Sequence, residues 1–446
     1  MIPLGIALTL LFVTAVMMLP RVYAALGVMA AVCYITQGQL YVVAGLNMHA
    51  IRIVLLAGLV RVFLRGEFRD IKFNKIDWTM IAFILTMTII PSWREGTWAI
   101  FVYRLGSAYD IALSYWVFRA LLKNWMEVEE FFYGLAFLIV PMTLEMIFEC
   151  VMHRSLYEPF GGIGDLTIRQ GRPRCQGAFR IGITAGVFGA TLIPLFVALL
   201  RSKGRQRGAV VGLICALIIT WTSNSSGPLM AALSSVVAWM FWPMRERMQT
   251  VRRGILAVLI GLHLSMKVPV WYIFSKLGML TGGDGWHRSY LIDRFIHYFP
   301  NWWLAGTEDT HDWMPYVLPD GNADITNLYV AVGITGGLTT LVLLIWMLVL
   351  CFKFLGTALS AVRTQFSETE ILLWGFGGAL FSHVVTLFSI TYWDQIYVVL
   401  WSLLAMISTT ATSVLEEVPS VDVEKSLEAE PDFDVEDLPG GRVRPG

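Results

Sequence analysis

Long apolar runs recur along this chain of 446 residues, and short polar segments separate them. A helix needs about 20 apolar residues to cross the hydrocarbon core of a bilayer, and many of the runs approach that length. Because the runs are continuously apolar and do not alternate, they predict membrane-spanning helices and exclude a transmembrane β-barrel. About thirteen spans are expected, or about twelve if the first two form a re-entrant pair. The expected ranges are 3–19, 22–36, 50–64, 77–91, 99–121, 130–150, 183–200, 209–222, 227–243, 254–268, 328–352, 369–389 and 393–410.

The overall composition agrees with a polytopic membrane protein. Hydrophobic residues make up 56% of the chain and charged residues only 15%, whereas about a quarter of the residues of a soluble protein are charged. Residues 1–19 lack the basic start of a signal peptide and precede further spans, so they are expected to remain as the first helix. The predicted fold is an all-α, polytopic transmembrane bundle over residues 1–412, followed by a separate tail over residues 413–446.

Basic residues gather in three loops that fall on one side when the crossings are counted, and this side is predicted to be cytoplasmic. The three clusters are Arg61, Arg65, Arg69, Lys72 and Lys75, then Arg201, Lys203, Arg205 and Arg207, then Arg245, Arg247, Arg252 and Arg253. The alternate loops then face outward, at residues 37–49, 92–98, 151–182, 223–226, 267–327 and 390–392. The tail is rich in Asp and Glu and poor in apolar residues, which predicts a disordered cytoplasmic segment.

The longest polar interruption, residues 267–327, combines tryptophans with arginines and histidines. Aromatic rings suit the headgroup region of a membrane, and arginines suit a phosphate. A helix is predicted over about 286–298, and Pro300 ends it. Its phase places Arg288 on the apolar stripe and Arg294 on the opposite face. Arg288 is therefore the better candidate for holding a substrate phosphate.

The outward loop 151–182 breaks the positive-inside pattern, because it carries Arg154, Arg169, Arg172, Arg174 and Arg180. Either lipid headgroup phosphate or a bound anionic substrate would explain these charges. Glu145 and Glu149 share one face of the preceding helix and are expected to reach the loop. In the simplest interpretation, one carboxylate neutralises one arginine.

Other candidate chemistry is weaker. The segment 307–312, TEDTHD, has the residue types of a metal loop, but the spacing is not specific and no metal site is expected. Its His311 is either a general base or a surface histidine. The sequence has no Walker loop, no GxGxxG followed by a βαβ pattern and no GxSxG elbow, so no nucleotide cofactor, nucleic acid or serine-hydrolase chemistry is expected. Cys150 and Cys175 could pair if both face an oxidising compartment.

Three segments carry short motifs, at residues 171–189, 285–307 and 325–338. The positions that define them are Arg174, Gly177 and Phe179, then Arg288, Pro300 and Gly306, then Asn327, Tyr329, Gly333 and Gly337. These motifs, together with the order of spans and loops over most of the chain, resemble the O-antigen ligase and polysaccharide polymerase superfamily of bacterial inner-membrane proteins. The resemblance implies a multi-pass protein of the bacterial inner membrane.

The resemblance also implies an activity. It is glycan transfer from an undecaprenyl-pyrophosphate donor to an acceptor hydroxyl at the periplasmic face, by a polymerase or ligase of O-antigen or exopolysaccharide synthesis. Three arginines would neutralise the pyrophosphate in place of a metal, namely Arg174, Arg180 and Arg288. The family commonly has a histidine base where this chain has Thr326, which favours a polymerase over a ligase. The expected bases are instead His311, Asp324 and Glu145.

Further assignments stay open at the level of the sequence. Trp302 and Trp303 either stack on sugar rings or anchor the segment at the membrane interface, and Asn327 belongs to the third motif. A transporter or flippase of a lipid-linked glycan is the alternative function, because Arg104 and Asp110 lie within a span. A third possibility is a non-catalytic scaffold whose acidic tail binds other polysaccharide-assembly proteins.

Overall fold

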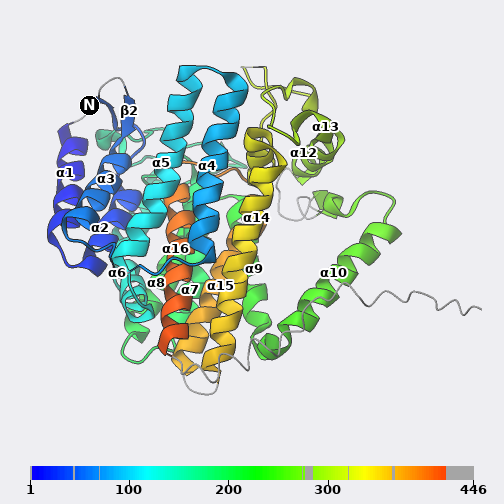
Figure 1. The fold of residues 1–446 in the computed structure, drawn as a ribbon. Coiled ribbons are helices and arrows are strands. Elements are labelled where there is room, and N and C mark those ends of the chain that lie inside the picture. Colours follow the sequence, from blue (N-terminus) through cyan, green and yellow to red (C-terminus); the bar gives the residue numbers. More distant parts are fainter. Residues whose placement is uncertain are drawn as a thin grey trace, which may run out of the picture.

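The computed structural model describes residues 3–43, 46–69, 71–273, 275–276, 285–319, 321–363 and 367–417, and it is almost entirely helical (Figure 1). The helices of the bundle are α1 (Pro3–Met18), α2 (Arg21–Tyr34), α3 (Ala50–Leu64), α4 (Lys75–Glu95), α5 (Trp98–Leu121), α6 (Trp125–Met152), α7 (Gly182–Leu199), α8 (Gln206–Thr222), α9 (Ser226–Met240), α14 (Leu328–Val362), α15 (Ser367–Leu387) and α16 (Gln395–Glu417). The predicted all-α bundle is confirmed. Most of the expected acidic tail, from residue 418 onward, lies outside the described residues.

The remaining elements are short or lie beside the bundle. The helical ones are α10 (Met248–Ser265), α12 (Gly285–His297), α13 (Phe299–Trp302) and the 3-10 turns η1 (Glu158–Phe160), η2 (Trp242–Arg247), η3 (Val270–Tyr272) and η4 (His311–Trp313). Two antiparallel hairpins pair β1 (Leu40–Val43) with β2 (Leu46–His49), and β3 (Ile168–Arg169) with β4 (Arg172–Pro173). The helix expected over about 286–298 is therefore present as α12.

Each expected span coincides with one helix, so the hydrophobic pattern located the helices correctly. Among the described residues, six helices are long and apolar enough to cross a bilayer, namely α4, α6, α7, α14, α15 and α16. The helix α9 and residues 242–265 form a further candidate only when they are counted together as one span. A bend of 68° separates the two pieces. Three more helices, α1, α2 and α8, are apolar but shorter. This set of helices indicates a multi-pass membrane protein.

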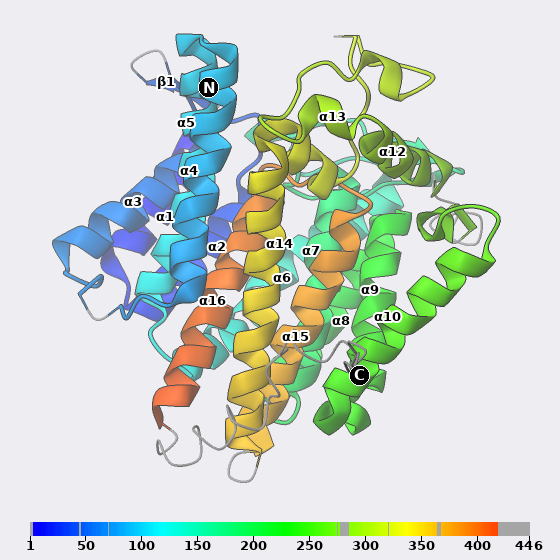
Figure 2. The same cartoon turned by 45° about the vertical axis from the view of Figure 1, so that its right-hand side comes forward.

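The helix α10 departs most from the expected bundle. It begins at Met248, ahead of the expected span 254–268, and it leans away from the other helices (Figure 2). Val251 is its one buried residue, and apolar side chains such as Leu256 and Leu264 are exposed. An apolar helix that is exposed on nearly every side suits a lipid environment better than water.

The loops expected to face outward meet at one end of the bundle, and the loops expected to be cytoplasmic meet at the other. Hydrogen bonds join loops of the first group, from Thr36 to Phe160, from Arg94 to Ala305 and from Asn224 to Arg169. Ion pairs join parts of the second group, between Arg21 and Glu127, Lys72 and Glu416, Lys203 and Glu368, and Arg245 and Glu370. The structure thus divides the loops between two ends as the basic clusters predicted.

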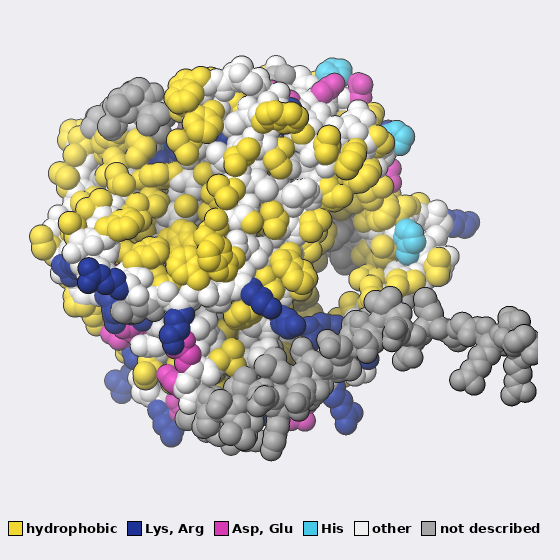
Figure 3. Space-filling view, viewed as in Figure 1, with side chains coloured by type: hydrophobic (Ala, Val, Ile, Leu, Met, Phe, Trp, Pro, Cys, Tyr) yellow, Lys and Arg dark blue, Asp and Glu magenta, His cyan; other side chains and the backbone are white. Residues whose placement is uncertain are grey.

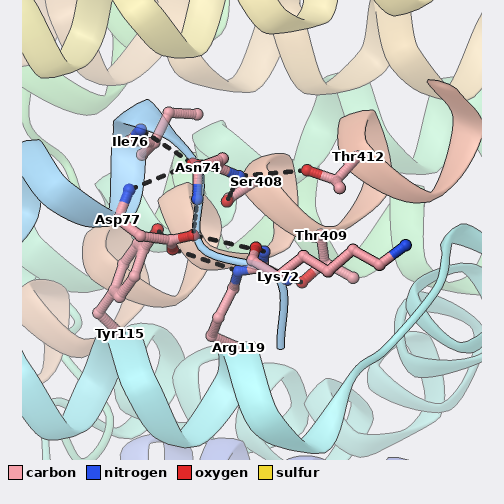
Figure 4. A network of polar contacts seen from close by, with 9 residues as sticks. All are labelled: Lys72, Asn74, Ile76, Asp77, Tyr115, Arg119, Ser408, Thr409 and Thr412. Carbon is pink, nitrogen blue, oxygen red and sulfur yellow. Dashed lines mark hydrogen bonds and ion pairs between the residues drawn. The ribbon is translucent and has the colours of Figure 1, made fainter. Parts of the chain in front are cut away.

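A buried ion pair between Asp77 and Arg119 joins three helices near the second end (Figure 4). Oδ1 of Asp77 lies 3.3 Å from Nε of Arg119 and accepts the Tyr115 hydroxyl at 2.6 Å. Asn74 caps α4 by accepting the Asp77 N–H, and it donates to Ser408 of α16 at 2.7 Å. Because each buried charge has a partner, the network can fix α4, α5 and α16 against one another.

The helix α14 is interrupted at Gly337, where φ is 74° and ψ is −174°. The N–H of Leu338 beyond the break donates to the Trp303 carbonyl at 2.7 Å. Arg94 donates to the carbonyl of Ile334, on the other side of the break, at 3.3 Å. The backbone groups that the break releases are therefore satisfied by α4 and by the segment that follows α13. This contact fixes the segment 285–307 on the end of the bundle.

Candidate functional site

Glu145 and Glu149 hold the loop 151–182 on the end of α6. Oε1 of Glu145 accepts the Ser155 hydroxyl at 3.1 Å and the backbone N–H of Leu156 at 3.2 Å. Oε2 of Glu149 accepts the backbone N–H of Gln176 at 2.7 Å. Both carboxyl groups reach the loop as expected, but the hydrogen bonds they accept come from its backbone and from a hydroxyl. Their contacts are those of anchors for the loop.

Arg174 belongs to the segment that these carboxyl groups position, and its side chain contacts the start of α9. Its Nε and Nη2 donate to Oγ of Ser225 at 3.1 and 2.5 Å. Burial lowers the pKa of Arg174, and the charge of Arg169 lowers it further. The guanidinium stays cationic at neutral pH, because arginine starts from so high a pKa. A hydroxyl does not neutralise this charge, so Arg174 can attract an anion.

Arg180 lies at the junction between the same loop and the connection from α15 to α16. Its Nη1 is 3.6 Å from Oδ2 of Asp394, and its side chain is 62% exposed. Gln395 fixes the junction by donating to the Ala178 carbonyl at 2.8 Å. Burial raises the pKa of Asp394, and the charges of Arg180 and His49 partly offset this rise.

His287 of α12 is 4% exposed and contacts Thr326, the residue just before Asn327. Its Nδ1 lies 3.1 Å from Oγ1 of Thr326, and its ring stacks on Tyr316 with the centroids 5.9 Å apart. The sequence-based phase of α12 needs correction, because the buried residues are Gly285, His287, Ser289 and Leu291 while Arg288 is half-buried. The buried face is turned toward His287 because α12 packs on the chain before α14.

A short connection, residues 388–394, runs between the His287–Thr326 contact and the Arg180–Asp394 pair. The Thr391 hydroxyl donates to the Ile325 carbonyl at 2.5 Å, next to Thr326. Residues 391 and 394 are three positions apart, so they are separated by about 10 Å at most. The His287–Thr326 contact and the Arg180–Asp394 pair therefore lie on either side of one connection. From within the bundle, His383 holds it through Nδ1, which is 2.9 Å from the Tyr392 hydroxyl.

The other expected bases lie on the surface. His311 is 66% exposed, with Nδ1 at 3.0 Å from Oδ1 of the neighbouring Asp312. Asp324 is also exposed. No group of three or more His, Cys, Asp or Glu side chains that could hold a metal ion occurs within the described part of the chain.

The expected glycan-contacting residues differ in exposure. Trp302 is 2% exposed, stacks on Phe295 and donates from its indole to the Phe295 carbonyl at 2.7 Å, so it packs in the core. Trp303 is 46% exposed. Asn327 caps α14, because Oδ1 accepts the backbone N–H of Tyr329 at 2.9 Å.

The sequence did not single out His287 or Asp394 as functional candidates. The resemblance gave an indirect signal for His287, because this chain has Thr326 where that family commonly has a histidine. A histidine from another segment could supply an imidazole at that place. The only signal for Asp394 was a charged residue near the start of the expected apolar span 393–410.

The fold and the site together define a multi-pass helical membrane protein with a polar, arginine-containing site at one end of its bundle. No known family model matches the chain, and no curated protein is significantly similar to it.

Proposed function

We propose that this protein is a metal-independent glycosyltransferase that uses a polyprenyl-pyrophosphate donor at the periplasmic face of the bacterial inner membrane. It transfers the glycan of an undecaprenyl-pyrophosphate donor to an acceptor hydroxyl, as a polymerase or ligase of O-antigen or exopolysaccharide synthesis. The observation that carries the proposal is the meeting of the loop 151–182, the segment 285–327 and the connection 388–394 at one end of an apolar bundle.

The proposed topology has twelve or thirteen spans, with these three segments in the periplasm and the C-terminus in the cytoplasm. Most Lys and Arg side chains visible in Figure 3 lie below the hydrophobic surface, at the end of the bundle opposite α12 and α13. Basic residues are retained on the cytoplasmic side of a membrane, so this distribution supports the assigned orientation.

The chemistry assigns charge stabilisation to arginines and proton transfer to a histidine. Arg174 and Arg180 lie on the loop 151–182, and Arg288 follows His287 on α12. All three would stabilise the pyrophosphate as negative charge develops on the leaving group. His287 is the preferred base, because it precedes Arg288 on α12 and Thr326 fixes its Nδ1. The exposed His311 and Asp324 and the anchoring Glu145 remain the other candidates.

The substitutions Arg174→Ala and Arg288→Ala test the proposal in cells that make the polymer. Loss of the positive charge should shorten or abolish the polymer, and short lipid-linked repeats should accumulate on the outer leaflet. The matched controls are Arg172→Ala, which removes an exposed arginine of the same loop, and Arg294→Ala, which removes an arginine that α12 holds against Tyr290. Normal polymer in both test variants would contradict the proposal.

A flippase of the same lipid-linked glycan is the second candidate, and one ion pair within the bundle favours it. Arg52 of α3 donates to both oxygens of Asp110 of α5, at 2.7 and 2.5 Å. Charges inside a membrane bundle often mark a transport path. If the protein is a flippase, Asp110→Asn should trap lipid-linked repeats on the inner leaflet, whereas a glycosyltransferase variant would leave them facing outward.

A further inference from the structure

Cys150 and Cys175 come together where α6 ends. Oε2 of Glu149 accepts the backbone N–H groups of Gln176 and Gly177 at 2.7 and 3.1 Å, so the last turn of α6 runs against the segment after β4. The two cysteines flank this contact, and their thiols lie close enough to interact electrostatically. Both are free thiols in the structure.

The two thiols differ in access. Cys150 is exposed, whereas Cys175 is buried. Burial raises the pKa of Cys175, and the charge of Glu149 raises it further. Because the thiolate is the reactive form, an external reagent should meet Cys150 first, and Cys175 should react only with a sulfur already bound beside it.

We propose that Cys150 and Cys175 are a disulfide-forming pair that tethers the segment carrying Arg174 to the end of α6. The oxidant is the disulfide of a thiol–disulfide oxidoreductase. The inference does not depend on the glycosyltransferase activity, because it rests on the contact between α6 and the loop.

The reaction proceeds in two exchanges that balance. The Cys150 thiolate attacks the disulfide of the oxidoreductase, which forms a mixed disulfide and releases one thiolate of the oxidoreductase. Cys175 then loses its proton to the carboxylate of Glu149, attacks the Cys150 sulfur and releases the second thiolate. Two cysteine thiols are oxidised to one disulfide, and the oxidoreductase disulfide is reduced to a dithiol.

The tether has a geometric consequence for the site. A disulfide holds two Cα atoms within about 7 Å, so it would add a covalent link to the contact that Glu149 makes with the loop backbone. The residue next to Cys175 is Arg174, which binds Ser225. Oxidation would therefore limit how far this arginine can move from the start of α9.

The test uses the purified full chain in detergent, incubated with an oxidised thiol–disulfide oxidoreductase, then alkylated after denaturation and digested. Of the five cysteines, three should be alkylated, and a peptide linking residues 150 and 175 should appear and vanish on reduction. Cys150→Ser should abolish the linked peptide, whereas Cys215→Ala should leave it unchanged. Alkylation of all five cysteines after this treatment would overturn the proposal.

Limited proteolysis tests the tether without relying on activity. Cleavage within residues 151–174 should leave the fragments joined in the oxidised chain and separate in the reduced chain. Cleavage of the chain should also slow severalfold on oxidation, because the loop opens less often. Cys150→Ser should show the faster rate under both conditions. Equal rates in the oxidised and reduced wild-type chain would contradict the tether.

Discussion

Nδ1 of His287 lies 3.1 Å from Oγ1 of Thr326, so α12 supplies an imidazole beside residue 326. The two residues are 39 positions apart in the chain. Thr326 can accept a hydrogen bond or donate one, and either arrangement fixes the tautomer of the ring. The contact places a titratable group at the junction of the segment 285–327 and the connection 388–394.

If His287 is the base, His287→Ala should lower the rate of glycan transfer by about 10²–10⁴-fold, the usual contribution of general base catalysis. The rate would be measured as polymer formed by membranes supplied with the lipid-linked donor. The control is His297→Ala, which removes an exposed histidine of the same helix. The double variant His287→Thr with Thr326→His should recover part of the rate. A wild-type rate in His287→Ala would exclude this residue as the base.

Gly337→Ala should destabilise the protein, because the break in α14 depends on this glycine. A Cβ at this position would lie 2.6 Å from the Leu304 carbonyl oxygen, and φ of 74° disfavours other residues. We expect a loss of about 1–3 kcal/mol, from strain and from displacement of the segment after α13. The measurement is thermal unfolding in detergent.

The matched control lies on the same helix. A Cβ at Gly356 would have no atom of the described chain within 4 Å, so Gly356→Ala should be neutral or slightly stabilising through helix propensity. Equal melting temperatures for Gly337→Ala and the wild type would show that the break tolerates a side chain.

Some features of the fold and the site could be predicted from the sequence, and others could not. Helix positions were predictable because the apolar pattern is local, and the division of loops between two ends followed from the basic clusters. The break at Gly337 was not predictable, since the Ile334 carbonyl that it releases accepts the Thr307 N–H and the side chain of Arg94, which is 240 positions away. The sequence located Arg174 and Arg180 in one loop, but only the fold places Arg180 against Asp394.

Breaking the ion pair between Asp77 and Arg119 should be strongly destabilising, because either partner alone would be a buried, uncompensated charge. Both residues are almost fully buried, at 0% and 5% exposure. Arg119→Met should cost about 3–5 kcal/mol, measured by thermal unfolding in detergent.

Two variants sharpen that measurement. Lys72→Ala removes a pair with Glu416 in which the lysine side chain is 75% exposed, and it should cost at most about 1 kcal/mol. The double variant Asp77→Asn with Arg119→Met should regain part of the loss, because no charge then stays buried. A double variant less stable than Arg119→Met would contradict this account.

The stability of the site should depend on pH through Asp394. Burial raises its pKa in the folded protein, and Arg180 and His49 offset only part of that rise. The folded protein therefore binds this proton more tightly than the unfolded chain. The resulting contribution to stability is fully present below the ordinary aspartate pKa of about 3.9, and it is lost as the pH rises through the folded value.

Asp394→Asn tests this dependence, because the amide stays neutral at every pH. The variant should melt close to the wild type near pH 4 and should gain relative to it as the pH rises toward 7. Asp165→Asn, at an exposed position of the outer loop, should show no such trend. If Asp394→Asn instead loses stability as the pH rises, the attraction between Arg180 and the carboxylate outweighs the cost of burying it, and the site depends on that ion pair.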